Sequence, residues 1–564
     1  MLLPLLLGCL TLAVLPAQAQ SHYANPILHA DYSDPDVCRV GEDYYMTASS
    51  FNCFPGLPIL HSRDLVNWTL VGAALTDYPG AEWTGPAHDF RTTVQHGNGV
   101  WAPAIRYHDG WFYIFCGDPD RGIFMVRTQD PCGRWEDPVW VVKAKGFIDP
   151  CPLWDEDGRA WLSHAAAGSR AGLKSILFVA PMAPDGTRLL GPSRIVFDGH
   201  KTQPTIEGTK FYKRDGRYYI FAPAGGVSTG WQTVLRADDP YGPYEERIVM
   251  AAAEGTINGP HQGGWVETPE GESWFLHFQD KGAYGRIVHL QPMTWLSDGW
   301  PLIGEDPDGD GIGQPVASYE IPVSDRNPDP NARQNLFDAS EGALHQKNLP
   351  LHQANPQDSC RIPAAVGPYG IPLDWQYPAV PSPYWHYALQ GGGVRLFSVE
   401  QKGDASLDNC PNLLLQKFPA ENFTVTARMV FHPHPQLEER AGFLVTGDEL
   451  AGLQLQARQD AVRLQFTSTR DLNWDDWMDL PYDSEREATI WVRLEVKAKD
   501  TGTPVPDAEC RFSYSRDGKR FVSVGDPFIA QPEHWIGAKF GFYCNRYAPK
   551  NDGGWLDVLD FSVR

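Results

Sequence analysis

The sequence predicts an all-β protein in which a five-bladed β-propeller precedes a concanavalin-like β-sandwich. Three observations support this prediction. A repeated pattern of short strands organises the N-terminal part of the chain, no long amphipathic helix pattern interrupts it, and the C-terminal part holds short strand candidates separated by turn residues. The 564 residues also exceed what one hydrophobic core supports, so two principal domains are expected.

The N-terminal repeat occurs five times. Each copy combines a short apolar stretch, a tight turn that contains glycine and an aromatic-rich strand, and the Asp-Gly and Glu-Gly pairs in these turns are hairpin signals. A period of roughly 50–65 residues suits a four-stranded propeller blade. The five copies begin at Asp34, Trp101, Asp149, Glu207 and His261.

The position of these opening residues predicts a site. The innermost strands of propeller blades run in one direction around a central channel, so equivalent residues converge at one mouth. Three carboxylates, from Asp34, Asp149 and Glu207, would crowd there. Because uncompensated charges in a funnel cost stability, a functional purpose explains them better than a structural one.

The repeats contain a series of motifs: Asn25-Pro26-Ile27-Leu28 with Asp34-Pro35-Asp36, Gly99-Val100-Trp101-Ala102-Pro103, Ile148-Asp149-Pro150, Thr205-Ile206-Glu207-Gly208 and Tyr284-Gly285-Arg286. In this order the motifs resemble those of glycoside hydrolase family 43. The resemblance extends over essentially the whole mature chain. It implies a five-bladed propeller, and a C-terminal β-sandwich like that of the two-domain members.

The resemblance also implies roles for the residues in these motifs. Asp34 matches the general base of the family, Asp149 the carboxylate that tunes the pKa and orients the substrate, and Glu207 the general acid. Arg286 is expected to contact the sugar. His261 is expected to lie at the channel centre, where some members hold a calcium ion or a water.

Further residues are expected to line the pocket. Trp101, Phe51 and Phe54 occupy positions that resemble its apolar wall. The resemblance implies that a loop of the sandwich reaches over the propeller mouth and closes the cleft, and Trp535 is the candidate for this loop.

The acidic residues fit glycoside hydrolysis with inversion of the anomeric configuration. One protonated carboxyl donates to the leaving oxygen, and one carboxylate activates a water on the opposite face, at a separation of roughly 6.5–9.5 Å. A third carboxylate near the acid raises the pKa of that acid by like-charge repulsion. Asp149 suits this task beside Glu207.

The chain is expected to comprise a signal peptide over 1–19, the propeller over 20–323, a linker over 324–335 and the sandwich over 336–564. The apolar segment from Met1 to Pro16 and the following Ala17-Gln18-Ala19 fit cleavage after residue 19, although no Lys or Arg precedes them. A secreted or periplasmic protein is therefore expected. The alternative is a lipoprotein, from the run that ends at Cys9.

The predicted strands of the sandwich are short and are separated by turn residues, as is typical of that fold. They are Leu413–Phe418, Phe423–Phe431, Gly442–Thr446, Gly452–Ala457, Val462–Thr467, Trp491–Val496, Arg511–Tyr514 and Lys539–Tyr543.

No cofactor is expected to be required, and a structural calcium ion is left open. Asp338 and Asp560, near the ends of the sandwich, are the candidate ligands, although the acidic pair usual before the first strand is only partly kept. The stretch from Asp306 to Gly311 resembles the opening of a calcium loop. Ala317 stands where the closing Glu of that loop belongs, so an acidic turn is expected instead.

Composition restricts the partners. A formal net charge of -23 disfavours nucleic acid, and after the N-terminus no apolar run is long enough for a membrane span. A plant polysaccharide or oligosaccharide is the expected substrate. The predicted activity is exo-acting, as a β-D-xylosidase, an α-L-arabinofuranosidase or both. The alternatives are an endo-arabinanase, an exo-galactanase and a non-catalytic carbohydrate-binding protein.

Overall fold

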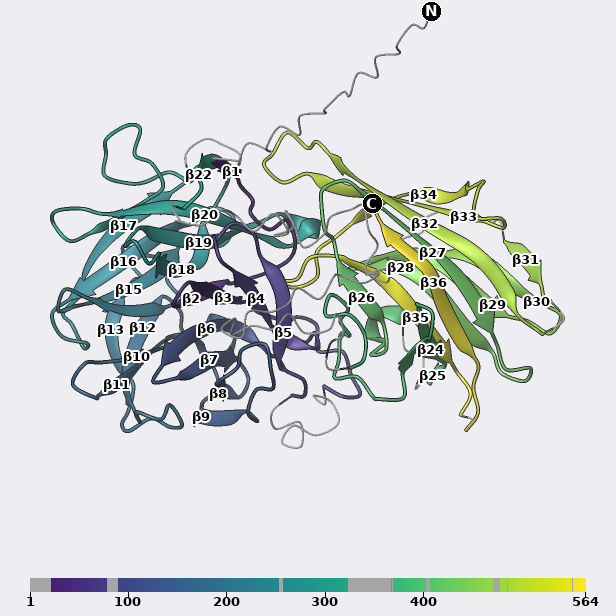
Figure 1. The fold of residues 1–564 in the computed structure, drawn as a ribbon, viewed down its shortest axis with the longest axis horizontal. Coiled ribbons are helices and arrows are strands. Elements are labelled where there is room, and N and C mark those ends of the chain that lie inside the picture. The colour runs from purple at the N-terminus through teal and green to yellow at the C-terminus, as the bar shows by residue number, and fades with distance from the viewer. Residues whose placement is uncertain are drawn as a thin grey trace, which may run out of the picture.

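The structure is a computed structural model that describes residues 22–78, 90–252, 257–322, 367, 369–401, 406–469, 477–483, 485–549 and 551–564. The expected signal peptide, the expected linker and Asp338 lie outside these residues. Two β domains lie side by side (Figure 1). Among the described residues, α1 (Gly168–Ala171) is a single α-helical turn, and no helix has the length and apolar character needed to span a bilayer.

The N-terminal domain consists of five four-stranded antiparallel sheets, each built from four consecutive strands, as a five-bladed propeller requires. Blade I comprises β2 (Asp36–Val40), β3 (Asp43–Thr47), β4 (Gly56–Ser62) and β5 (Thr69–Leu75). Blade II comprises β6 (Trp101–His108), β7 (Trp111–Asp118), β8 (Gly122–Thr128) and β9 (Val139–Lys143). Blade III comprises β10 (Phe147–Trp154), β11 (Ala160–Ala166), β12 (Ile176–Met182) and β13 (Arg194–Asp198). Blade IV comprises β14 (Lys210–Arg214), β15 (Arg217–Ala224), β16 (Trp231–Ala237) and β17 (Glu245–Ala251). Blade V comprises β18 (His261–Glu267), β19 (Ser273–Asp280), β20 (Arg286–Trp295) and β21 (Pro301–Ile303).

The hairpin signals of the sequence form the turns between the first two strands of the blades. Asp109 and Gly110 both have positive φ, at 48° and 80°, and join β6 to β7. Asp215 and Gly216, at 49° and 76°, join β14 to β15. Two successive residues with positive φ match the twist of the flanking strands, and Asp-Gly tolerates that backbone better than most pairs.

The ring is closed by the segment that precedes blade I. β1 (His22–Ala24) pairs with β22 (Ser318–Glu320), which follows blade V, and Leu28 bridges to Val288 in β20. Between these contacts the Asn25 side chain donates to the carbonyl oxygens of Leu290 and Val316, both at 2.8 Å. The start of the propeller is thereby attached to its last blade.

A residue with positive φ recurs at or just before the innermost strand of every blade. These residues are Asp34, Ala102, Asp149, Gly208 and Gln262, with φ of 54°, 42°, 56°, 67° and 35°. In β6, β10 and β18 the strand register shifts at this position, so the residue forms a β-bulge. The bulge marks the equivalent position in the five repeats.

This equivalence corrects the predicted alignment of the repeats. Asp34 and Asp149 do share one position, but Trp101, Glu207 and His261 each precede the equivalent residue by one. The sequence alignment matched residues by chemical type, whereas the backbone conformation defines the repeat. The five predicted opening residues are therefore not one equivalent set.

The C-terminal domain is a sandwich of two seven-stranded sheets. The first has the order β23 (His386–Ala388), β24 (Val394–Phe397), β36 (Trp555–Val563), β27 (Phe423–His432), β32 (Ala488–Lys499), β33 (Asp507–Ser515) and β34 (Val522–Ala530). The second has the order β25 (Val399–Glu400), β35 (Lys539–Arg546), β28 (Glu439–Thr446), β29 (Leu450–Ala457), β30 (Ala461–Ser468) and β31 (Met478–Pro481), with β26 (Leu414–Lys417) also paired to β35.

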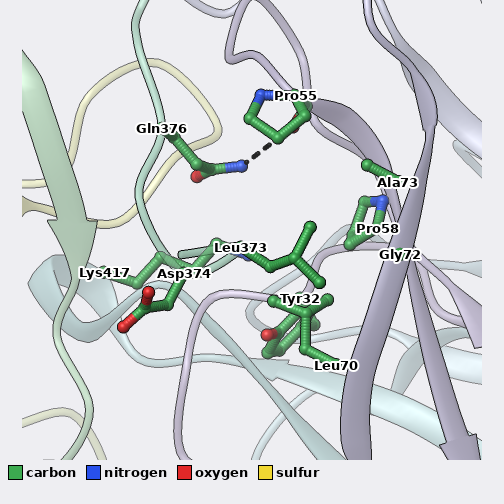
Figure 2. A pocket seen from close by; sticks show the side chains of 10 residues that line it. All are labelled: Tyr32, Pro55, Pro58, Leu70, Gly72, Ala73, Leu373, Asp374, Gln376 and Lys417. Atoms are coloured by element: carbon green, nitrogen blue, oxygen red, sulfur yellow. Dashed lines mark hydrogen bonds between the residues drawn. The ribbon is translucent and has the colours of Figure 1, made fainter. Parts of the chain in front are cut away.

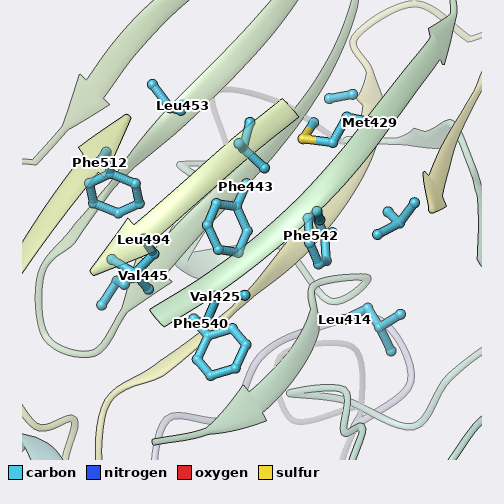
Figure 3. Packing of buried hydrophobic residues seen from close by; sticks show 14 of the residues in the cluster. Leu414, Val425, Met429, Phe443, Val445, Leu453, Leu494, Phe512, Phe540 and Phe542 are labelled. Atoms are coloured by element: carbon cyan, nitrogen blue, oxygen red, sulfur yellow. The ribbon is translucent and has the colours of Figure 1, made fainter. Parts of the chain in front are cut away.

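Alternating residues of both sheets fill the space between them (Figure 3). Phe443 and Phe542 of the second sheet stack with ring centroids 4.8 Å apart. Phe512 of the first sheet lies 6.2 Å from Phe443. These rings belong to the main core of the sandwich, and Ala283 and Tyr284 of blade V also join that core.

Blade I contacts the sandwich domain directly. Phe54 and Tyr377 exchange two backbone hydrogen bonds, at 2.8 and 2.7 Å. Beside this pairing lies a small hollow between the domains, to which blade I contributes Pro58 and Leu70 and the sandwich side contributes Asp374 and Lys417 (Figure 2). None of the three predicted acids lines this hollow.

Candidate active site

Asp34 is held at the start of blade I by a hydrogen-bond relay. The Ser49 hydroxyl donates to Asp34 Oδ2 at 2.5 Å and accepts the backbone N–H of Ala102 at 2.7 Å. Arg286 Nη1 lies 3.4 Å from the other carboxylate oxygen, so its charge compensates that of Asp34. The carboxylate is buried and its orientation is fixed by blades I, II and V.

Asp149 supports the backbone that carries Glu207. Its Oδ2 accepts the N–H of Gly208 at 2.7 Å, and its main-chain oxygen accepts the Thr209 hydroxyl at 2.7 Å. Burial raises the pKa of Asp149 to about 7, the Asp34 charge acts in the same direction, and the Gly208 N–H opposes both. Because Gly208 directly follows Glu207, the two acids are fixed relative to each other.

Glu207 has the environment of a proton donor. Burial raises the pKa of Glu207 to about 8, and the negative charges of Asp149 and Asp34 add to this effect, while Arg286 opposes it. A carboxyl with this pKa keeps its proton at neutral pH. The structure therefore brings all three acids into one electrostatically connected group, as the propeller argument predicts.

Arg286 lies between this group and the sandwich domain. Its guanidinium carbon lies 4.7 Å from the centroid of the Phe278 ring and 5.2 Å from that of Trp535. The Arg286 backbone N–H donates to Asp31 Oδ1 at 2.9 Å. A cation held between two aromatic rings keeps its charge beside Asp34 with little freedom to move.

His261 is almost wholly buried, at 1% exposure, and neither ring nitrogen has a hydrogen-bond partner within the described part of the protein. Burial lowers the pKa of His261 to about 3, and the Arg286 charge lowers it further, so the imidazole is neutral. Calcium prefers oxygen ligands, whereas this side chain offers two nitrogens. His261 therefore does not fit as a direct calcium ligand.

The predicted calcium ligands of the sandwich do not form a visible site in the residues that the structure describes. Asp560 Oδ2 accepts a hydrogen bond from Arg428 Nε at 2.6 Å, and its predicted partner Asp338 is not described. In the propeller, Asp306, Asp308 and Asp310 cluster at the surface. Asp306 accepts backbone N–H groups of residues 309, 310 and 311, so this group is an acidic turn.

The apolar wall of the mouth contains two of its three predicted residues. Phe51, which is buried, and Trp101, which is half-buried, pack with Ile536 of the sandwich domain. The prediction for Phe54 is wrong. Its ring is completely buried in the core of blades I and II, beside Tyr78, so it cannot contact a sugar.

The segment 531–538, which joins β34 to β35, reaches the propeller mouth and is called the roof loop below. Trp535 stands on it with φ of 70° and 41% exposure, over Arg286. Its neighbour Ile536 packs on the apolar wall. The structure therefore places Trp535 where the sequence analysis expects it.

Three anchors that hold this arrangement were missed by sequence reasoning. Asp31 accepts the Gly537 N–H at 3.0 Å with Oδ2, while its Oδ1 accepts the Arg286 N–H. His96 Nδ1 lies 2.7 Å from Glu533 Oε1, and this hydrogen bond raises the pKa of His96 to about 9. The third, Lys210, is completely buried, and its Nζ donates to the Pro103 carbonyl oxygen at 2.8 Å. None lies in a recognisable motif.

The arrangement can transfer a proton and activate a water at one mouth of the channel. Glu207 holds a proton near neutral pH, whereas Asp34 is oriented by Ser49 and faces a guanidinium. Glu207 is therefore suited to donate a proton, and Asp34 is suited to accept one. Such a pair fits the acid and the base of glycoside hydrolysis.

Comparison with known proteins agrees with this chemistry. The model of glycosyl hydrolases family 43 matches residues 23–301, and that of the beta xylosidase C-terminal concanavalin A-like domain matches residues 369–564. A beta-xylosidase of Formosa agariphila is 34% identical over 593 aligned positions, which cover 96% of this chain and 90% of that protein. A non-reducing end alpha-L-arabinofuranosidase of Bacteroides ovatus is 29% identical and covers 76% of this chain and 75% of that protein.

Solved structures share the two-domain fold. A xylan beta-1,4-xylosidase from Bacillus halodurans has a TM-score of 0.72 at 22% identity and covers 96% of this chain and 99% of that one. A family 43 protein from Bacillus licheniformis also has a TM-score of 0.72 at 22% identity, with 96% of this chain and 99% of that one covered. At this identity the likeness supports the fold alone.

Proposed function

Because the chain belongs to glycosyl hydrolase family 43, we propose that it is an exo-acting, inverting glycosidase that releases xylose, L-arabinose or both from plant polysaccharide or its oligosaccharides. The main support is the different surroundings of its two central acids. Burial and like charge hold a proton on Glu207, while Asp34 faces Arg286. An inverting reaction requires this division of roles.

In the proposed reaction, Glu207 gives its proton to the glycosidic oxygen as the bond to the anomeric carbon breaks. Asp34 takes a proton from a water that attacks the opposite face of the sugar. Asp149 keeps Glu207 in place through the Gly208 N–H and keeps its pKa raised through its own charge. Arg286 keeps positive charge beside the base.

The roof loop supports exo action. Contacts of Ile536 with Phe51 and Trp101, and of Trp535 with Arg286, narrow the mouth on the sandwich side. A closed pocket admits the end of a glycan chain, whereas an open groove admits its middle. The choice of pentose rests on the relatives, which are named for xyloside and arabinofuranoside cleavage.

We further propose that the protein acts outside the cytoplasm. The support is the apolar segment from Met1 to Pro16 with the Ala17-Gln18-Ala19 sequence behind it. Mass spectrometry of the protein from culture medium or periplasm tests this proposal, with an N-terminus at Gln20 as the expected result. A protein retained in the cytoplasm with its apolar segment intact would contradict it.

The activity is tested on nitrophenyl β-D-xylopyranoside and nitrophenyl α-L-arabinofuranoside, with proton NMR of the first anomer released. We expect hydrolysis of at least one substrate with inversion, and monosaccharide as the first product from xylo- or arabino-oligosaccharides. A retained anomer would overturn the mechanism, and longer first products would overturn exo action.

The acid is tested by Glu207→Gln, which keeps the shape of the side chain and removes its proton-donating carboxyl. We expect a loss of roughly 10²–10⁴-fold in kcat on substrates with poor leaving groups. Glu156→Gln is the matched control, because this carboxylate in blade III is 90% exposed. Equal activity of both variants would exclude Glu207 as the acid.

A further inference from the structure

An arginine of blade III reaches across to blade II. Arg170 stands on α1, within the segment 167–175 that joins β11 to β12 and is called the α1 connection below. Its Nη2 donates to Asn98 Oδ1 at 2.6 Å, and its Nε donates to Asp120 Oδ1 at 3.0 Å. The guanidinium carbon lies 5.7 Å from the centroid of the Trp101 ring. One side chain thus contacts three residues in blade II or directly before it.

The Trp101 ring is held between this arginine and the roof loop. Its indole N–H donates to the carbonyl oxygen of Gly97 at 2.7 Å. Gly97 lies so close to the roof loop that a Cβ atom there would be 2.3 Å from the His534 carbonyl oxygen. The next residue, Asn98, accepts the hydrogen bond from Arg170. A change at Arg170 therefore acts on the segment that sets the position of the Trp101 ring.

The α1 connection also contacts the segment that carries the acid. Ser175, at its far end, is buried and has a φ of 63°. The Ser175 hydroxyl accepts the backbone N–H of Thr205 at 2.8 Å. Because Thr205 lies two positions before Glu207, the connection extends from the Trp101 wall to the segment that leads into the acid.

The acid defines the side of the site from which the leaving group departs. In the proposed reaction Glu207 protonates the glycosidic oxygen, so the leaving sugar lies on the side of this acid. Arg170, with 22% of its side chain exposed, and the half-buried Trp101 are both partly accessible. The exposed part of an aromatic ring can pack against the C–H face of a sugar.

We propose that Arg170 is a positioning residue that sets the preference for sugar leaving groups, because it holds Trp101 as the wall against which the leaving sugar packs. This inference rests on the proposed function, since it assigns the leaving-group side of the same site. Asp120 compensates the charge of Arg170, so the wall suits a neutral sugar. A leaving group too small to reach Trp101 does not depend on Arg170.

The test compares two substrates of the pentose that the parent releases, its disaccharide and its glycosyl fluoride, whose leaving group is a single atom. In Arg170→Met we expect kcat/KM on the disaccharide to fall roughly 10–200-fold, mainly through KM, while the fluoride is hydrolysed as by the parent. Arg170→Lys should lie between the two, because one ammonium replaces only part of the guanidinium contacts. Lys145→Met is the control, since Lys145 is 63% exposed and shares the partner Asp120 at 3.8 Å.

Equal losses on the disaccharide and the fluoride would overturn the proposal, because Arg170 would then support the fold or the acid instead of the leaving sugar. Parental activity of Arg170→Met on the disaccharide would overturn it as well. If the Arg170 variants do not fold, Asn98→Ala, which removes an acceptor of Arg170, takes their place with the same expectation. Failure of the proposed function itself would appear differently, as a parent protein that hydrolyses neither substrate.

Discussion

Two regions of the active site are held by different kinds of contact. The first is the floor, formed by the acids Asp34, Asp149 and Glu207, and the second is the roof loop. On the floor, Asp34 and Asp149 sit at β-strand starts in a left-handed backbone, are buried, and have their oxygens fixed by short hydrogen bonds. On the roof, Trp535 is 41% exposed and stands on a loop. In the proposed function, the chemistry therefore takes place at rigid strand starts, and the substrate is contacted by a loop that the second domain supplies.

The largest effect is expected on the floor, from Asp34→Asn. This change keeps the hydrogen bond from Ser49 possible but removes the base, so kcat falls by roughly 10²–10⁴-fold. Steady-state kinetics measure it. Asp215→Asn is the control, since Asp215 shares the left-handed backbone in an exposed turn. If Asp34→Asn kept most of its kcat, the floor would not be the catalytic region.

A smaller effect is expected on the roof, from Trp535→Ala. Loss of the ring removes a contact to Arg286 and a wall of the pocket, so kcat/KM falls roughly 10–200-fold, mainly through KM. Trp477→Ala removes another exposed tryptophan of the sandwich and should change neither constant. A fall in kcat alone would show that the roof takes part in the chemical step.

The junction of floor and roof is tested by Asp31→Asn. The amide offers one acceptor oxygen where the carboxylate serves both the Arg286 and Gly537 N–H groups. The unfolding free energy should fall by about 1–2 kcal/mol, because one buried N–H loses its partner. Urea unfolding measures this loss. An unchanged midpoint would mean that Asp31 does not join the two regions.

The smallest effect concerns the ion pair between His96 and Glu533. Glu533 raises the pKa of His96 to about 9, so the stabilisation is complete below the unfolded value near 6.5 and is lost as the pH rises through about 9. His96 is 41% exposed at its side chain, so solvent screening limits the effect to less than about 1 kcal/mol.

Because Glu533 lies on the roof loop, loss of its ion pair with His96 loosens that loop. We therefore expect a modest rise in KM above pH 9 that is absent in His96→Gln. Substitution of His200, an exposed histidine that pairs with Asp198, should leave this rise unchanged. A KM rise that persisted in His96→Gln would assign it to another group.

The sequence predicts the propeller well because each blade is a local unit. Strand, turn and strand follow each other within one repeat, and Asp-Gly pairs mark the hairpins at Asp109 and Asp215. All eight predicted sandwich strands also have counterparts, from β26 to β35. The short β23, β24, β25 and β31 escaped prediction, as did β34 and β36, whose polar or edge residues weaken the alternation of apolar side chains.

The site was predictable only where motifs mark it. The acids and Arg286 lie in such motifs, whereas Asp31, His96 and Lys210 act through partners more than 100 positions away. Phe54 was misplaced because a phenylalanine near a motif has the same appearance whether it faces a pocket or a core. Backbone conformation, which alone reveals the equivalent residue of each blade, is not visible in residue types.

The hydrogen bond from Gly537 to Asp31 joins positions 506 residues apart. During synthesis, individual blades can form from neighbouring hairpins as soon as they leave the ribosome, but this bond must wait until both domains have been translated. A nascent chain therefore acquires its acids early and its finished pocket late. We therefore expect hydrolysis to begin only when the polypeptide is nearly complete.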